Sequence, residues 1–419
     1  MLNPKLLKSE DGIRCIKENL KKRQWDTKDF DFFLEEYYKE KELKQELENL
    51  QAQRNQNSKQ IGILVREGKQ KEADELKAKV KEIGEKIANI KIKINELDDK
   101  VKEVLLSLPN ILDSSVPEGE DESNNLLVRE WGNKPTFDFD PLPHYEIATK
   151  HNYIDFERGV KLSGSRFYVY NEEIAKLERE IIRFMLNLHR EDGYLERMVP
   201  FLVNDESMIG TGQLPKFAEE FYRIEKDALS LIPTAEVPLT NLYRDEILSE
   251  KDLPILLTAA TPCFRREAGA AGKDTRGIIR VHQFQKVELV ILSHPEKSSE
   301  HHEALTKQAE KVLQKLNLHY RVMLLCSGDT SAASAKTYDI EVYMPGSKRY
   351  VEISSCSNFL DYQARRAKIR YKNSDGKNDY LHTLNGSGVA AGRLVAALME
   401  NYQKKDGTID FEKIYSLIR

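Results

Sequence analysis

Charged and aromatic side chains alternate along two segments that flank a glycine-rich stretch. The first segment ends with Arg265 and Glu267, which share one face if the strand is extended. In the second segment Phe284, Lys286 and Glu288 share a face by the same alternation. An Arg can hold a phosphate, an aromatic ring can stack on a base, and a carboxylate can accept from an amine or hydroxyl. This face therefore predicts a site for a nucleotide and a small polar cation; the alternative is a solvated hairpin face.

The stretch between the two segments weighs against that alternative, because it concentrates glycine and basic residues. These residues are Gly269, Gly272, Lys273, Arg276 and Gly277. We interpret it as a functional loop between two strands.

A second glycine pattern, NGSGVAAGR, covers residues 385–393. Its spacing does not fit the GxGxxG dinucleotide fingerprint, and no parallel βαβ unit surrounds it. We interpret it as a loop that approaches a ligand and then enters a helix whose small residues, Ala390, Ala391 and Gly392, pack on a sheet. Arg393, one turn into that helix, is placed to reach a phosphate.

Composition limits the class of protein. At 419 residues the chain is long enough for two or three domains. No apolar run approaches the length of a membrane span, and the first residues lack the features of a secretion or import signal, so we expect a cytosolic protein. The four cysteines are too far apart for a CxxC metal pair and are expected to be reduced thiols. A net charge of −4 means that any RNA must bind through local basic patches.

The first 110 residues are organised by heptads. Apolar residues recur in alternating steps of four and three at Leu76, Val80, Ile83, Ile87, Ile90, Ile94, Leu97, Val101 and Val104. An earlier run from Leu43 to Leu64 keeps the same steps, with Arg54 and Asn57 at two seam positions. A polar turn at residues 66–74 separates the two runs. The pattern predicts an antiparallel coiled-coil arm over about residues 30–106, roughly 50–55 Å long; taken alone, a scaffolding or dimerisation coiled coil explains it equally well.

Residues 111–145 are rich in Pro, Asp and Glu and are expected to form a surface linker before a domain at 146–419. In that domain helices alternate with short strands such as VELVIL and YRVMLL, which read as antiparallel. Apolar residues at helical spacing predict a helix over 174–189. The fold class is therefore α+β, with an antiparallel sheet flanked by helices and an N-terminal antiparallel α-helical coiled-coil arm.

The segment 264–290 resembles motif 2 of the class II aminoacyl-tRNA synthetases, in the version found in the seryl-tRNA synthetases. Further matches, in family order, are IPTAEVPLTNL (232–242), TGQLPKF (211–217), AKTYDIEV (335–342), EISSCSNFLDYQARR (352–366) and HTLNGSGVAAGR (382–393). The chain departs from the family at Ser331 and Ala332, where a Gly-Phe pair is usual, and at Val199, which replaces the first of two prolines usual in motif 1.

The resemblance implies a class II catalytic domain that activates L-serine with ATP to seryl-adenylate, releasing pyrophosphate, and transfers the seryl group to tRNA(Ser). Arg265 and Arg393 are its expected catalytic residues. The expected ATP-binding residues are Arg265, Arg266, Glu267, Phe284, Glu352, Ile353, Ser354, Ser355 and Arg393. The expected serine-binding residues are Thr234, Ala235, Glu236, Arg265, Glu288, Asn385 and Ser387.

The resemblance also implies that Glu352 and Ser355 hold Mg²⁺ with ATP, as hard oxygen ligands should. Strict strand alternation would instead pair Glu352 with Ser354. The assignment of Ser355 therefore requires a β-bulge or a strand end between the two residues.

The resemblance gives the arm a role in holding tRNA(Ser), and extends it to tRNA(Sec). Its expected phosphate contacts are Arg54, Lys59, Arg66, Lys69 and Lys71. The helix at 174–189 resembles motif 1 and implies a homodimer. Two alternatives are a ligase that loads an amino acid onto a carrier protein, whose known relatives lack the arm, and an inactive RNA-binding paralogue, against which the intact Arg265, Glu267, Glu352 and Arg393 argue.

Overall fold

Two long helices pair along the N-terminal part of the chain. The structure is a computed structural model that describes residues 1–268 and 276–419, so Gly269, Gly272 and Lys273 of the predicted loop lie outside the described residues. The chain divides into a hairpin unit, Arg14–Leu108, and a sheet unit, Met1–Ile13 with Pro109–Arg419. Within the described residues, no helix is both long and apolar enough to span a membrane.

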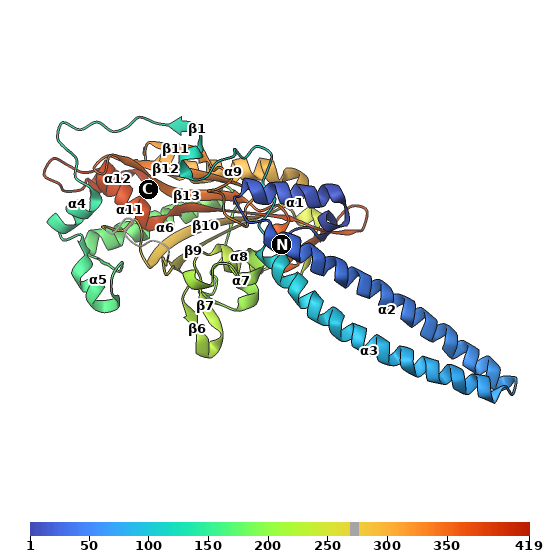
Figure 1. Ribbon diagram of the computed structural model, residues 1–419. Helices are drawn as coiled ribbons and strands as arrows, with labels where there is room; N and C mark the ends of the chain where they lie inside the picture. Colours follow the sequence, from blue (N-terminus) through green and yellow to red (C-terminus); the bar gives the residue numbers. More distant parts are fainter. Residues whose placement is uncertain (269–275) are drawn as a thin grey trace. The chain divides into compact units, whose positions relative to one another are not determined.

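In the hairpin unit, α2 (Lys28–Arg66) and α3 (Gln70–Ser107) lie side by side (Figure 1). Every apolar seam position predicted on α3 is buried or half-buried, which confirms the heptad assignment. On α2 the polar seam position Asn57 is half-buried, whereas Arg54 is exposed. The predicted turn at 66–74 is too long, because only residues 67–69 separate the helices; Gly68 adopts the left-handed conformation there (φ 75°). Helices of 39 and 38 residues are each roughly 57 Å long.

The sheet unit is built on eight strands in the order β1-β11-β12-β13-β16-β10-β9-β4. All neighbours are antiparallel except β4 and β9, which are parallel. The strands are β1 (Leu126–Trp131), β4 (Leu195–Glu196), β9 (Ile255–Phe264), β10 (Gln283–Ser293), β11 (Tyr320–Leu324), β12 (Lys336–Met344), β13 (Arg349–Asn358) and β16 (His382–Ala390). The predicted α+β class with an antiparallel sheet is confirmed.

The two faces of this sheet bury different sets of side chains. On one face α6 (Glu172–Glu191), α9 (Ser298–Lys315) and α11 (Ala391–Asn401) form the larger apolar core with Val287 and Leu289 of β10. On the other face Val290 and Leu292 join a smaller core with α8 (Glu236–Asn241) and α10 (Tyr362–Ala367). Because β10 alternates strictly, Lys286 and Glu288 emerge on the side of the smaller core.

The remaining helices and strands are short. They are α1 (Glu10–Lys22), α4 (His144–Lys150), β2 (Ile154–Asp155), α5 (Phe156–Ser163), β3 (Val169–Tyr170), β5 (Leu202–Val203), α7 (Asp205–Thr211), β6 (Arg223–Ile224), β7 (Leu229–Leu231), β8 (Ile247–Ser249), β14 (Arg370–Lys372), β15 (Asn378–Tyr380) and α12 (Phe411–Leu417).

Two sequence interpretations need correction. The predicted linker at 111–145 contains β1, which pairs with β11 as an edge strand and anchors Arg129 against Glu310. The predicted loop at the start of NGSGVAAGR is part of β16, and α11 begins at Ala391. The close approach there belongs to Gly388, where an added Cβ would lie 2.4 Å from Nε2 of His189.

Candidate active site

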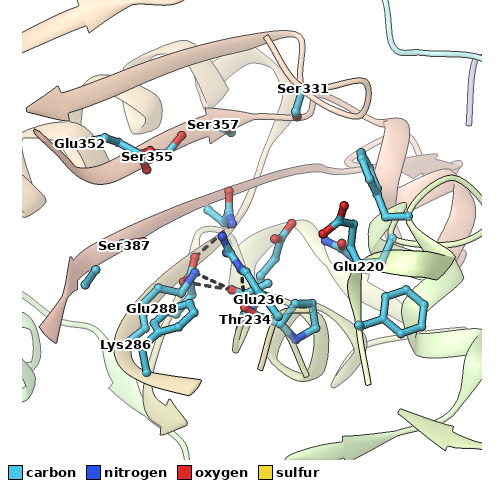
Figure 2. Close-up of a pocket in the computed structure, with 18 of the residues that line it drawn as sticks. Glu220, Thr234, Glu236, Lys286, Glu288, Ser331, Glu352, Ser355, Ser357 and Ser387 are labelled. Carbon is cyan, nitrogen blue, oxygen red and sulfur yellow. Dashed lines mark hydrogen bonds and ion pairs between the residues drawn. The ribbon is translucent and has the colours of Figure 1, made fainter. Parts of the chain in front are cut away.

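A cavity of about 490 Å³ opens over β10, β13 and β16 and reaches the start of α11. Figure 2 shows that Glu352 and Ser355 come from one strand and Lys286 and Glu288 from another, with Thr234 and Glu236 beside the latter pair. Most of the predicted site residues line this one cavity. They are Thr234, Glu236, Arg265, Glu267, Phe284, Glu288, Glu352, Ile353, Ser355, Asn385, Ser387 and Arg393.

The Glu288 carboxylate is fixed by three neighbours in the inner part of the cavity. Its Oε2 atom lies 2.5 Å from Nζ of Lys286 and accepts from Oγ1 of Thr234 at 3.1 Å. Its Oε1 atom accepts from Nδ2 of Asn385 at 3.0 Å. Glu288 is almost fully buried, so these partners offset the cost of desolvating its charge. The result is a rigid acceptor with a fixed orientation.

Glu236 is a second buried carboxyl group in the same wall. Burial, and then the charge of Glu288, raise the pKa of Glu236 to about 7. Its Oε1 atom accepts from Nε2 of Gln363 at 2.6 Å. Gln363 is itself oriented by Thr211 and Thr383, since it donates to the carbonyl of the first and accepts from the hydroxyl of the second. Gln363 thus holds Glu236 in place, and the carboxyl group changes its ionisation near neutral pH.

Arg265 and Phe284 form the middle of the cavity. The guanidinium carbon of Arg265 lies 5.3 Å from the ring centroid of Phe284, and Nε donates to the carbonyl of Pro233 at 3.3 Å. β9 ends at Phe264, so the prediction that Arg265 and Glu267 share a strand face is wrong. Glu267 has a positive φ of 52° and pairs with Arg280 at 2.7 Å. Both predicted residues nevertheless line the cavity.

Arg393 and Glu352 meet at the outer part of the cavity. Nη1 of Arg393 lies 3.3 Å from Oε2 of Glu352 and donates to the backbone carbonyl of Glu352 at 2.7 Å. Nε of Arg393 donates to the carbonyl of Ile279 at 3.2 Å. Desolvation in the cavity wall opposes the ionisation of Glu352. The positive charges of Arg393 and then Arg265 outweigh this effect and hold the pKa of Glu352 below its ordinary value.

A β-bulge in β13 places Glu352 and Ser355 on the same side. Ile340 pairs with Ser354 and Glu341 pairs with Glu352, so Ile353 is the additional residue. The bulge that the assignment of Ser355 requires is therefore present.

The outer part of the cavity fits a hard divalent cation that also binds phosphate. Glu352 and Ser355 offer a carboxylate and a hydroxyl, and Asp339 pairs with Ser355 in register. The buried Oδ1 atom of Asp339 has no hydrogen-bond partner among the described residues. Across residues 1–268 and 276–419, no cluster of three or more His, Cys, Asp or Glu side chains could hold a metal ion without further ligands. Such a set suits Mg²⁺, which usually keeps water and phosphate oxygens among its ligands.

Three predicted residues do not line the cavity. Ala235 is fully buried in the smaller core. Arg266 is half-exposed and lies 3.7 Å from Glu219. The hydroxyl of Ser354 donates to the backbone carbonyl of Ser387 at 2.6 Å, on the side away from Ser355.

Several lining residues were given no role by the sequence. Lys286 lies on the predicted face, and only the structure shows that it fixes Glu288. Gln213 and Phe217 belong to the TGQLPKF segment, which matches the family, but the sequence analysis assigned them no role. Glu220 accepts from the backbone of Ala268 at 3.3 Å, and no periodicity marks it. Ser331, which stands in place of the glycine usual in the family, also lines the cavity (Figure 2).

In the hairpin unit, the five predicted phosphate contacts are all exposed. Arg66 ends α2, Lys69 lies in the turn and Lys71 is in the first turn of α3, so these three lie at the tip. Lys69 pairs with Glu67 at 2.8 Å, whereas the other two extend from the helix ends.

Family models match both parts of the chain. A model described as the seryl-tRNA synthetase N-terminal domain matches residues 1–112, and one described as the tRNA synthetase class II core domain (G, H, P, S and T) matches residues 219–402. A serine–tRNA ligase from Leptospira biflexa serovar Patoc is 58% identical over 377 residues, which cover 90% of each chain. One from Fervidobacterium nodosum is 51% identical over 417 residues, covering 99% of this chain and 97% of the other. The crystal structure of seryl-tRNA synthetase from Pyrococcus horikoshii complexed with ATP superposes with a TM-score of 0.94 at 37% identity, covering 100% of this chain and 98% of that one.

Proposed function

On the premise that this chain belongs to the seryl-tRNA synthetase family, and so activates L-serine with ATP and charges tRNA(Ser), we propose how its residues divide the work. The inner part of the cavity, around Glu236 and Glu288, binds serine. The middle and outer parts, from Phe284 to Arg393, bind ATP. One observation supports this division above all: a rigid, buried carboxylate acceptor and an outer part that contains Arg393 beside Glu352 share a single cavity.

We propose that Glu288 accepts from the side-chain hydroxyl of serine, with Asn385 and Ser387 completing a small polar pocket. Thr234 and Glu236 lie beside the ammonium group, which an ionised carboxylate attracts. With alanine bound, the acceptor position of Glu288 that Lys286, Thr234 and Asn385 leave open would stay unfilled, and a site of this kind can discriminate by about 10⁴ or more. The specificity for serine thus follows from an unpaired polar group and not from pocket volume.

In the activation step the serine carboxylate attacks the α-phosphate of ATP. A bond forms between a carboxylate oxygen and phosphorus, the bond to the bridging oxygen breaks, and pyrophosphate leaves. No protein nucleophile is required, so this chain contributes position and charge. We propose that Arg265 binds the α-phosphate and the serine carboxylate, that Arg393 binds the γ-phosphate, and that Phe284 stacks on the adenine.

Mg²⁺ would bind at Glu352 and Ser355, where it supplies charge neutralisation for the phosphates of ATP. The two side chains fit because the bulge at Ile353 turns them to the same side. The low pKa of Glu352 keeps this carboxylate ionised, as a metal ligand must be.

In the transfer step a ribose hydroxyl at the 3′ end of the tRNA attacks the seryl carbonyl carbon, and AMP leaves. We propose that Arg54, Lys59, Arg66, Lys69 and Lys71 contact the tRNA backbone. We further propose that tRNA(Sec) is a substrate, that two copies associate through the helix resembling motif 1, and that the enzyme works in the cytoplasm. Charging of purified tRNA(Sec) tests the proposed second substrate. The mass measured by sedimentation tests the proposed dimer.

Pyrophosphate exchange with each of the twenty amino acids tests the central claim. We expect exchange that depends on serine and that alanine does not support. If serine supports no exchange, the reading of the inner part of the cavity is wrong. Exchange without subsequent charging of tRNA(Ser) would instead locate the failure in the tRNA contacts.

A further inference from the structure

A buried histidine outside the cavity is linked to one of its catalytic arginines. His144 is the first residue of α4 and is almost fully buried, as is Glu400 near the end of α11. Nδ1 of His144 lies 2.9 Å from Oε1 of Glu400, and the backbone N–H of His144 donates to the same oxygen at 3.0 Å. The carboxylate also accepts from the N–H and hydroxyl of Ser347, each at 3.0 Å.

The other ring nitrogen faces the backbone that borders the ATP site. Nε2 of His144 accepts from the N–H of Ile278 at 3.3 Å. Because Nδ1 donates to a carboxylate and Nε2 accepts, the ring is neutral with its hydrogen on Nδ1. Gly277 leaves room for this contact: an added Cβ would lie 2.1 Å from Nε2, and its φ is 78°.

The same backbone segment also positions Arg393. Ile278 and Ile279 are buried and line the cavity, and the carbonyl of Ile279 accepts from Nε of Arg393. Arg393 and Glu400 are seven residues apart on α11, so they lie on one face of the helix about two turns apart. Two contacts therefore join α11 to the backbone segment 277–279. Arg393 contacts the segment directly, and Glu400 contacts it through His144.

We propose that His144 is a positioning residue for ATP activation: by accepting the Ile278 N–H, it holds the backbone segment 277–279 so that the Ile279 carbonyl orients the guanidinium of Arg393. The inference rests on the proposed role of Arg393 in binding the γ-phosphate. His144 touches neither ATP nor serine. Its loss should impair the use of ATP and leave the serine pocket unaffected.

Two isosteric variants separate the two hydrogen bonds of the ring. In His144→Asn the side-chain amide can replace Nδ1 as donor to Glu400, but nothing accepts from Ile278. In His144→Gln the side-chain oxygen can replace Nε2 as acceptor, and the donor to Glu400 is lost. His319→Asn is the matched control, because His319 is also buried and hydrogen-bonded, to Trp131 and Tyr350, at the β1 edge of the sheet.

The measurement is pyrophosphate exchange by the full chain at varied ATP and at varied serine, together with the melting temperature. We expect His144→Asn to lower kcat/KM for ATP about tenfold with the KM for serine within twofold of wild type. We expect His144→Gln to retain most of kcat/KM for ATP even where its melting temperature falls. His319→Asn should change only the melting temperature.

A double-mutant cycle with Arg393→Lys decides whether the effect passes through Arg393. We expect the tenfold loss from His144→Asn to shrink below twofold in the Arg393→Lys background. Equal losses for the Asn and Gln variants, in step with melting temperature, would show that His144 is only structural, as would multiplicative losses in the cycle. If His144→Asn does not fold, a folded His144→Gln with a tenfold loss for ATP would overturn the inference. A wild-type chain without serine-dependent exchange would instead refute the proposed function.

Discussion

Replacing Glu236 by Gln should make the protein more stable and less active at the same time. The pKa of Glu236 is raised from its ordinary 4.5 to about 7, because burial and the neighbouring Glu288 both oppose its charge. Differences of this size correspond to about 3 kcal/mol of unfavourable ionisation in the folded state. Gln is a neutral replacement of the same shape and can still accept from Gln363.

The sign of the stability effect follows from the direction of the pKa shift. A carboxyl group with a raised folded-state pKa stabilises the fold fully below its unfolded pKa, and that contribution is lost as pH rises from about 4.5 to about 7. Above about pH 7 the wild type contains an ionised, destabilising Glu236, whereas Glu236→Gln does not. We therefore expect the melting temperature of the variant to exceed that of wild type at about pH 8, with the difference shrinking towards about pH 5.

Activity should change in the opposite direction. In our proposal the ammonium group of serine requires ionised Glu236, so kcat/KM for serine should rise with pH up to about 7 and then level off. In Glu236→Gln this rise should disappear, and kcat/KM at about pH 8 should fall by about 10- to 150-fold, the value of a hydrogen bond to a charged group. The assay is pyrophosphate exchange at saturating ATP from about pH 6 to about pH 8.5. A pH-dependent rise that persists in the variant, or a variant that melts below wild type at about pH 8, would refute this account of Glu236.

Four further changes, three in the cavity and one in the arm, test other parts of the proposal. Glu288→Ala should impair serine activation by at least a hundredfold while the protein stays folded, and an unchanged kcat/KM for serine with unchanged rejection of alanine would contradict our assignment. Arg265→Lys and Arg393→Lys keep the charge but lose the planar fork, so each should reduce exchange by about tenfold or more; a seryl-adenylate analogue complex with Arg265 beyond about 4 Å of both phosphate and carboxylate would argue against its role. Replacing residues 30–106 by a short Gly/Ser link should spare adenylate formation and abolish tRNA charging, and charging by the intact enzyme should fall steeply with salt; joint loss of both half-reactions would make the arm structural, and joint survival would make it dispensable.

Periodic features of the fold could be predicted from the sequence, because each follows from one repeating geometry. The heptads of the hairpin and the alternation along β10, which turns Lys286 and Glu288 to the same side, are of this kind. The edge strand at 126–131 was missed because its surroundings are rich in Pro and acidic residues and its alternation is brief. The strand that continues directly into α11 was predicted as a loop, because glycine is depleted in strands and common in loops.

Contacts between distant parts of the chain could not be predicted in the same way. Nothing local in the sequence indicates that Gln363 holds Glu236, or that Lys286 and Asn385 meet on one carboxylate. Most of the site residues that the family resemblance indicated line the cavity, but the resemblance could not say which neighbours fix their charge and orientation. Those neighbours were visible only once the sheet had brought β10 and β16 together.

The bulge at Ile353 sets which residues in the second half of β13 face the cavity. Before it, Val351 faces the larger core and Glu352 the cavity; after it, Cys356 faces that core while Ser355 and Ser357 face the cavity. If Ile353 instead took a regular place in the strand, opposite Ile340, no side chain would be lost, yet every residue after it would change sides. Ser355 and Ser357 would then face the larger core, and Ser354 and the soft thiol of Cys356 would face the cavity, where a hard cation is needed. The identity of the ion that this site can accept therefore depends on one irregularity in the strand as much as on its side chains.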